Sequence, residues 1–100
     1  MNSDGSMPAG IKVYATPYCG DTRRSRRVLD ELQIAYDFID IRADQEGARW
    51  VMEVNNGFRS SPTILFPDGS ILVEPREAVL RAKLDTLQSA GFLLTDPSSS

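Results

Sequence analysis

Histidine is absent from this chain of 100 residues, and cysteine occurs only once, at Cys19. Without histidine the chain cannot form a Ser–His or Cys–His catalytic pair, and most kinds of zinc site are excluded. With one cysteine it cannot form an internal disulfide. Any disulfide of Cys19 must therefore join it to another molecule, and in a reducing compartment we expect such a bond to be transient.

The chain also lacks long apolar runs and any excess of basic residues. Its formal net charge is -3, with 25% charged and 41% hydrophobic residues, and this balance gives no indication of nucleic acid or anionic lipid as a partner. No run approaches the roughly 18 apolar residues of a membrane span, and residues 1–10 lack the apolar centre of a signal peptide. We therefore expect no nucleic-acid partner, no membrane association and a cytoplasmic location.

The length allows one modest hydrophobic core and no second one. Serine, glycine, aspartate and proline are concentrated near both ends of the chain. This composition predicts a disordered tail over residues 1–10, one domain over residues 11–90 and a flexible tail over residues 91–100.

The first half of the chain has the pattern of a strand, a helix, a second strand and a second helix. Strands are predicted over residues 11–15 and 36–41, and helices over residues 20–33 and 44–55, the second ended by Asn56-Gly57. The apolar and small side chains on one face of the first helix are Thr22, Ser25, Val28, Leu29 and Leu32. A right-handed crossover through this helix should make the two strands parallel neighbours.

The second half predicts a hairpin and a last helix. Strands over residues 63–66 and 70–73 are joined by the turn Pro67-Asp68-Gly69. The last helix should have Pro75 at its first position and end at Gly91. The complete order is β-α-β-α-β-β-α, and the fold class is α/β.

Cys19 stands where the first strand gives way to the first helix, in Thr16-Pro17-Tyr18-Cys19-Gly20-Asp21-Thr22. Exposed amide N–H groups and the positive end of the helix dipole stabilise a thiolate at such a position. The alternative is a buried cysteine that acts as a small hydrophobe. Pro17 and Gly20 are typical of loops and no apolar run surrounds the sulfur, so the pattern favours a reactive thiol.

Charges on the first helix act on Cys19 in opposite directions. Asp21 should raise the pKa of the thiol, whereas Arg23 should lower it. The other arginines add positive potential to the same helix, and we interpret Arg26 and Arg27 as a solvated helix face. We expect the helix terminus and the arginines to prevail, so that the pKa is lowered.

The element order, the cysteine after the first strand, and Ser61-Pro62-Thr63 at the third strand together resemble the small glutaredoxin form of the thioredoxin fold. This form is a four-stranded mixed sheet flanked by helices. The resemblance spans residues 11–87, and residues 54–63 and 66–70 are most similar to the mycoredoxin-like branch of actinobacterial glutaredoxins. It implies a cis peptide bond before Pro62. If the third strand is antiparallel to the first, Pro62 should lie beside Cys19, where Ser61, Pro62 and Thr63 would contact the substrate backbone.

The main departure from the resembled family is Thr22. Dithiol members carry a second cysteine at this position, and a hydroxyl cannot replace it in disulfide exchange, although it can hydrogen-bond a thiolate. The resemblance therefore implies a monothiol thiol–disulfide oxidoreductase with Cys19 as nucleophile and Thr22 as its partner. Its substrates would be S-thiolated proteins or small mixed disulfides. We expect a monomer with no tightly bound cofactor and no metal.

The small thiol that serves as co-substrate is predicted from what the chain does not share with glutathione-dependent glutaredoxins. Those proteins have a basic residue shortly before the cysteine and a Gly-Gly-x-x-Asp run after the fourth strand, where this chain has Thr16-Pro17-Tyr18 and residues 72–76, Leu-Val-Glu-Pro-Arg. Mycothiol is therefore favoured over glutathione. Pro17, Tyr18, Gly20 and Arg59 complete the expected binding set, with surface packing and solvation as the alternative roles of Tyr18 and Arg59.

Two other functions compete with this hypothesis. Monothiol glutaredoxins with a Cys-Gly-Phe-Ser motif bridge a [2Fe-2S] cluster between two subunits, but here Asp21-Thr22 replaces Phe-Ser and adds a carboxylate beside an anionic cluster. A catalytically silent binding module on the same scaffold is the second alternative, because a fold does not by itself establish an activity.

Overall fold

The structure is a computed structural model that describes residues 10–93. Of the tails predicted over residues 1–10 and 91–100, residues 1–9 and 94–100 lie outside the described part. The element order is β-α-β-α-β-β-α, as predicted. The elements are β1 (Ile11–Ala15), α1 (Gly20–Glu31), β2 (Tyr36–Asp40), α2 (Gln45–Val54), β3 (Thr63–Leu65), β4 (Ile71–Val73) and α3 (Glu77–Ser89).

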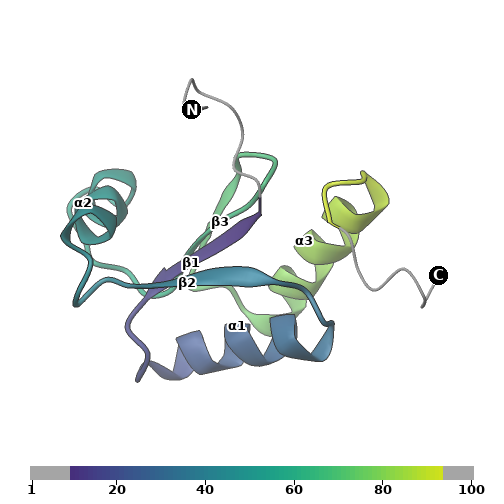
Figure 1. The fold of residues 1–100 in the computed structure, drawn as a ribbon, viewed down its shortest axis with the longest axis horizontal. Coiled ribbons are helices and arrows are strands. Elements are labelled where there is room, and N and C mark those ends of the chain that lie inside the picture. Colours follow the sequence, from purple (N-terminus) through teal and green to yellow (C-terminus); the bar gives the residue numbers. More distant parts are fainter. Residues whose placement is uncertain (1–9, 94–100) are drawn as a thin grey trace.

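The four strands form one mixed sheet in the order β2-β1-β3-β4 (Figure 1). β1 is parallel to β2, as the crossover rule predicts, and antiparallel to β3, which pairs in turn with β4. In this register Tyr14 lies opposite Thr63. The carboxyl end of β1 therefore lies beside the start of β3, and this places the loop that carries Cys19 next to Pro62.

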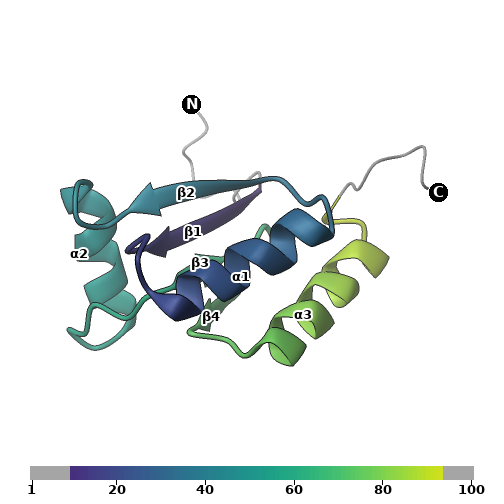
Figure 2. The ribbon, with the colours of Figure 1, turned by 90° about the horizontal axis from the view of Figure 1, so that it is seen from below.

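The helices are divided between the two faces of the sheet. Figure 2 shows α1 and α3 side by side on one face, with α2 beyond the carboxyl ends of β1 and β2. Alternate residues of β1, namely Ile11, Val13 and Ala15, are buried against α1 and α3. A smaller cluster joins Ala48 and Val51 of α2 to Ile41, the residue after β2. The main core thus fixes α1 on the sheet.

Three details of the sequence-based prediction are corrected. Leu32 is not part of the buried face of α1, because the helix ends at Glu31 and Leu32 is its C-cap, 37% exposed. Pro75 does not occupy the first position of α3, because Arg76 is the N-cap. β1 has the predicted bounds, whereas β2, α2, β3 and β4 are shorter than predicted by one residue at one or both ends, where boundaries are hardest to read from a pattern.

No helix within residues 10–93 is both long enough and apolar enough to cross a membrane.

Gly47 allows α2 to lie close to the sheet, because a Cβ at this position would come within 2.9 Å of Ile39 Cγ2 and 3.3 Å of Tyr14 Cδ2. We predict that Gly47→Ala lowers the free energy of unfolding by about 1 kcal/mol, since overpacking outweighs the gain in helix propensity. Urea unfolding of the variant and of wild type measures this difference in the free energy of unfolding. Gly20→Ala is the matched control, because a Cβ on Gly20 meets nothing within 4 Å. Equal stabilities of the two variants would contradict the prediction.

Candidate active site

Cys19 is the N-cap residue of α1. Its backbone is extended (φ -76°, ψ 135°), and no side-chain oxygen caps this helix end. The side chain of an N-cap residue normally accepts a hydrogen bond from the second or third helical N–H. At this position those N–H groups belong to Asp21 and Thr22, so the partly exposed sulfur of Cys19 faces the donors that a capping oxygen would otherwise occupy.

The pKa of the Cys19 thiol is lowered from its ordinary value. The largest cause is the hydrogen bond from the Thr22 backbone N–H; the Asp21 N–H and the Thr22 hydroxyl act in the same direction, against partial burial and the charge of Asp21. The predicted direction is therefore confirmed, as are the helix terminus as its cause and the opposing effect of Asp21. The prediction for Arg23 is wrong, because among the described residues no arginine contributes to this shift.

The arginines of α1 have other contacts. Arg24 forms an ion pair with Asp21 at 2.7 Å, which places a positive charge beside the carboxylate nearest to the thiol. Arg26 is not solvated as predicted, because its guanidinium lies 4.3 Å from the ring centroid of Phe38 and its Nε donates to the Tyr36 hydroxyl. Arg27 is exposed, as predicted. The arginines therefore act on the surface of the helix and not on the sulfur.

The segment before β3 reaches the sulfur. The Ser61–Pro62 peptide bond is cis, as the family resemblance implies, and the Cys19 thiol donates to the Ser61 carbonyl oxygen at 3.5 Å. Pro62 is buried, and its carbonyl accepts a hydrogen bond from the Glu74 N–H. Strand register thus brings Cys19, Ser61 and Pro62 together, although they are about 40 residues apart in the sequence.

The Ser61 hydroxyl connects this segment to both sides of the Cys19 loop. Its Oγ accepts from the Thr16 backbone N–H at 3.0 Å and lies 3.1 Å from Thr22 Oγ1. Thr22 is completely buried. The sequence analysis assigned Ser61 only a backbone role, because its side-chain contacts depend on tertiary structure.

Thr63 lies differently from the other predicted site residues. Its side chain is completely buried, where its hydroxyl donates to the Ser60 carbonyl and accepts from Asn55 Nδ2. Its backbone lies between β1 and β4 in the sheet. Thr63 therefore anchors the segment from within, and its side chain does not face the thiol.

The outer side of the site carries an exposed ring and two guanidinium groups. Tyr18 is 72% exposed, and the Arg42 guanidinium lies 4.9 Å from its ring centroid. Arg42 also forms a bidentate ion pair with Asp40, which holds the pKa of that carboxyl below its usual range. Arg59 is exposed and donates to the Ile41 carbonyl at 3.0 Å. Sequence reasoning missed Arg42, because nothing local marks an arginine after β2 as a neighbour of Tyr18.

Pro17 and Gly20 flank the thiol in the sequence and differ in exposure. Pro17 is partly exposed, whereas Gly20, the first residue of α1, is exposed and has open space around it. A substrate can therefore approach over this side of the loop.

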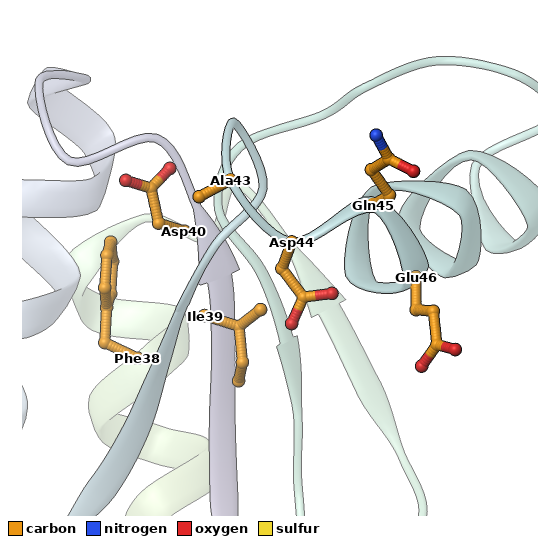
Figure 3. A pocket seen from close by; sticks show the side chains of 7 residues that line it. All are labelled: Phe38, Ile39, Asp40, Ala43, Asp44, Gln45 and Glu46. Carbon is orange, nitrogen blue, oxygen red and sulfur yellow. The ribbon is translucent and has the colours of Figure 1, made fainter.

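A hollow of about 480 Å³ lies between β2 and the start of α2 (Figure 3), and Cys19 is not among the residues that line it. It is lined by Phe38, Ile39, Asp40, Ala43, Asp44, Gln45 and Glu46. Two of its three acids have structural roles: Asp40 holds Arg42, and Asp44 caps α2 by accepting from the Gly47 N–H. Within residues 10–93 no group of three or more acidic or cysteine side chains could hold a metal ion.

Comparisons with known proteins agree on one family. The sequence profile of the glutaredoxin family matches residues 11–71. A Mycobacterium tuberculosis protein named as a glutaredoxin is 40% identical over 78 residues, which are 78% of this chain and 93% of that protein. Mycoredoxin 1 of Corynebacterium glutamicum is 35% identical over 79 residues, which are 79% of this chain and 98% of that protein.

Solved structures show the same architecture. Oxidized glutaredoxin 2 from Chlamydomonas reinhardtii superposes with a TM-score of 0.62 at 24% identity, with coverage of 84% of each chain. The solution structure of glutaredoxin from Brucella melitensis gives 0.59 at 24% identity and covers 88% of this chain and 96% of that one. The predicted thioredoxin-like fold is therefore confirmed.

The contribution of the Thr22 hydroxyl to the thiolate can be measured with Thr22→Val. This variant removes the hydroxyl and keeps the backbone N–H, so we predict a higher pKa of Cys19 and, below that pKa, a roughly two- to tenfold slower alkylation by iodoacetamide. Alkylation rates measured against pH give both the pKa of Cys19 and the change in rate. Thr86→Val on α3 is the control, since Thr86 is exposed and bonds only within its own helix. An unchanged pKa in Thr22→Val would contradict the role of the hydroxyl.

Proposed function

This chain belongs to the glutaredoxin family and is a glutaredoxin-like thiol–disulfide oxidoreductase, and we propose that it works by a monothiol mechanism. The single observation that carries this proposal is that Thr22 occupies the third position of α1, where a resolving cysteine would have to stand, and that no other cysteine exists in the chain. The substrates we propose are S-thiolated proteins or small mixed disulfides.

The proposed cycle has two exchange steps. The Cys19 thiolate attacks the small-thiol sulfur of a protein mixed disulfide, so that a bond between Cys19 and the small thiol forms while the protein thiolate leaves and takes a proton from water. A second small-thiol thiolate then attacks the sulfur of the first. The two small thiols leave as their disulfide, and the Cys19 thiolate is restored with no net loss of electrons from the protein.

The contacts of Cys19 suit both steps. The α1 N–H groups stabilise the thiolate both as nucleophile and as the group that leaves when the cycle closes. The Ser61 carbonyl, which accepts from the neutral thiol, loses that donor when the thiol ionises. We propose that this carbonyl and the backbone around Pro62 then accept the extended chain of an incoming disulfide.

We propose that Tyr18 and Arg59 form the wall and the cation of the small-thiol site, with Pro17 and Gly20 on its open side. Arg59 uses one N–H on Ile41 and keeps its others for a ligand. The relative named mycoredoxin 1 supports mycothiol as the co-substrate. Glutathione, which carries carboxylates in place of sugar hydroxyls, is the competing co-substrate.

We also propose a cytoplasmic monomer whose domain spans residues 11–90. The thiol chemistry needs no resident metal or prosthetic group, because both exchange steps proceed through sulfur alone. A reducing compartment would supply the small thiol that closes the cycle.

The monothiol proposal predicts different outcomes for two classes of substrate. The wild-type protein should reduce a protein–mycothiol or protein–glutathione mixed disulfide, whereas on a protein disulfide it should stop at a covalent complex that waits for external thiol. Thr22→Cys should release that complex, since it supplies a resolving sulfur, and Cys19→Ser should be inactive on both. Mass spectrometry of the reaction mixtures and turnover assays measure these outcomes.

Two results would contradict this function. The absence of any adduct or turnover with either mixed disulfide would favour the silent binding module. Formation of a coloured dimer on anaerobic reconstitution with iron and sulfide, together with no turnover, would favour the cluster carrier.

The proposed cation can be tested with Arg59→Gln. We predict that kcat/KM for a glutathione mixed disulfide falls about three- to tenfold, because a charge-assisted contact to a carboxylate is lost at an exposed position. The loss should be smaller for a mycothiol mixed disulfide, which offers no carboxylate. Arg27→Gln, on the exposed side of α1, is the control. Equal activity of Arg59→Gln and wild type on the glutathione substrate would contradict this role.

A further inference from the structure

The Ser61 hydroxyl lies where the end of β1, the start of α1 and the segment before Pro62 meet. Three hydrogen-bonding groups surround its Oγ: the Thr16 backbone N–H at 3.0 Å, Thr22 Oγ1 at 3.1 Å and Thr16 Oγ1 at 3.4 Å. The Ser61 side chain is only partly exposed, and Thr22 is completely buried. In each hydroxyl pair either oxygen could be the donor, so the directions have to be argued from the one fixed donor, the Thr16 N–H, and from the group that each remaining proton reaches.

A serine hydroxyl has one proton to donate and two lone pairs to accept with. The Thr16 N–H can only donate, so it occupies one lone pair of Ser61 Oγ. The nearer of the two hydroxyl oxygens, Thr22 Oγ1, is the better acceptor for the Ser61 proton, and the Thr16 hydroxyl can then donate to the second lone pair. In this arrangement every donor and acceptor of the Ser61 hydroxyl is used.

The same arrangement determines where the Thr22 proton points. If Thr22 Oγ1 accepts the proton of Ser61, its own proton cannot be directed back to Ser61. The other group that the Thr22 hydroxyl reaches is the Cys19 sulfur, whose pKa its hydrogen bond lowers. With its one proton directed at the sulfur, Thr22 Oγ1 has only lone pairs to offer to Ser61 Oγ, 3.1 Å away. The order is thus Thr16 N–H to Ser61, Ser61 to Thr22, and Thr22 to the sulfur.

We propose that Ser61 is a positioning residue for the reaction, whose hydroxyl donates to Thr22 and thereby directs the Thr22 proton at the Cys19 thiolate. This role rests on the proposed function only in that Cys19 must ionise. It adds a side-chain role to the backbone role proposed for Ser61 above. The alternative is that the hydroxyl merely ties β1 to the segment before Pro62.

The test is the pKa of Cys19 in the full chain, measured without any substrate from the pH dependence of thiolate absorbance. Ser61→Ala should raise this pKa and slow alkylation below it by about three- to tenfold. Ser61→Val should do the same, since it also removes the hydroxyl but fills the volume, and Ser61→Thr should stay close to wild type. Ser60→Ala is the matched control, because its side chain takes no part in the chain of donors.

A double-mutant cycle distinguishes positioning from a direct effect. If Ser61 acts through Thr22, the Ser61→Ala/Thr22→Val double variant should have the same Cys19 pKa as Thr22→Val alone. Thr16→Val should leave the pKa within experimental error of wild type, since the Thr16 N–H remains.

Two outcomes would overturn the proposal. One is additive shifts in the double variant; the other is a lower melting temperature in Ser61→Ala and Ser61→Val with an unchanged pKa, which would assign the hydroxyl a structural role alone. Failure of the proposed function has a different signature, because wild type itself would then lack turnover whatever the pKa of the Ser61 variants.

Discussion

The site depends on one interaction, in which the sulfur of Cys19 takes the place of the capping oxygen at the start of α1. Most helices satisfy their first N–H groups with a serine, threonine, aspartate or asparagine side chain. Here no side-chain oxygen does so, and the N–H groups of Thr22 and Asp21 lower the pKa of the thiol instead. Because the chain has no histidine to act as a base, the backbone of α1 is the main source of activation for the proposed nucleophile.

Sheet topology brings the second half of the site to this sulfur. β1 and β3 are central, antiparallel strands, so the residue that follows β1 and the residues that precede β3 meet at one edge. The Ser61 hydroxyl and carbonyl fasten that meeting point to Thr16 and Cys19. The buried side chain of Thr63 anchors the same segment from inside. The Cys19 thiol at the start of α1 and the Ser61 carbonyl before β3 are thus held by the same core.

Local pattern was sufficient to predict the element order and the place of Cys19, and the family resemblance supplied the thioredoxin-like fold. The element order, the parallel pairing of β1 with β2 and the position of Cys19 at a helix start all follow from periodicity and loop-forming residues. What could not be predicted depends on tertiary contacts. The packing of Arg26 on Phe38 and the position of Arg42 over Tyr18 involve residues from different elements. No spacing along the chain indicates these contacts. The expected effect of Arg23 on the pKa of Cys19 was wrong for the same reason. Arg23 is close to Cys19 in the sequence but does not contribute to the shift of its pKa.

The central claim is that folding itself makes the thiolate easier to form. The most direct measurement is the pKa of Cys19 in the folded chain and in the same chain unfolded in urea, from thiolate absorbance against pH. The account predicts a lower pKa in the folded state, so that the free energy of unfolding rises with pH between the two pKa values and this added stability is lost as pH falls through the folded one. A folded pKa equal to or higher than the unfolded one would contradict the account.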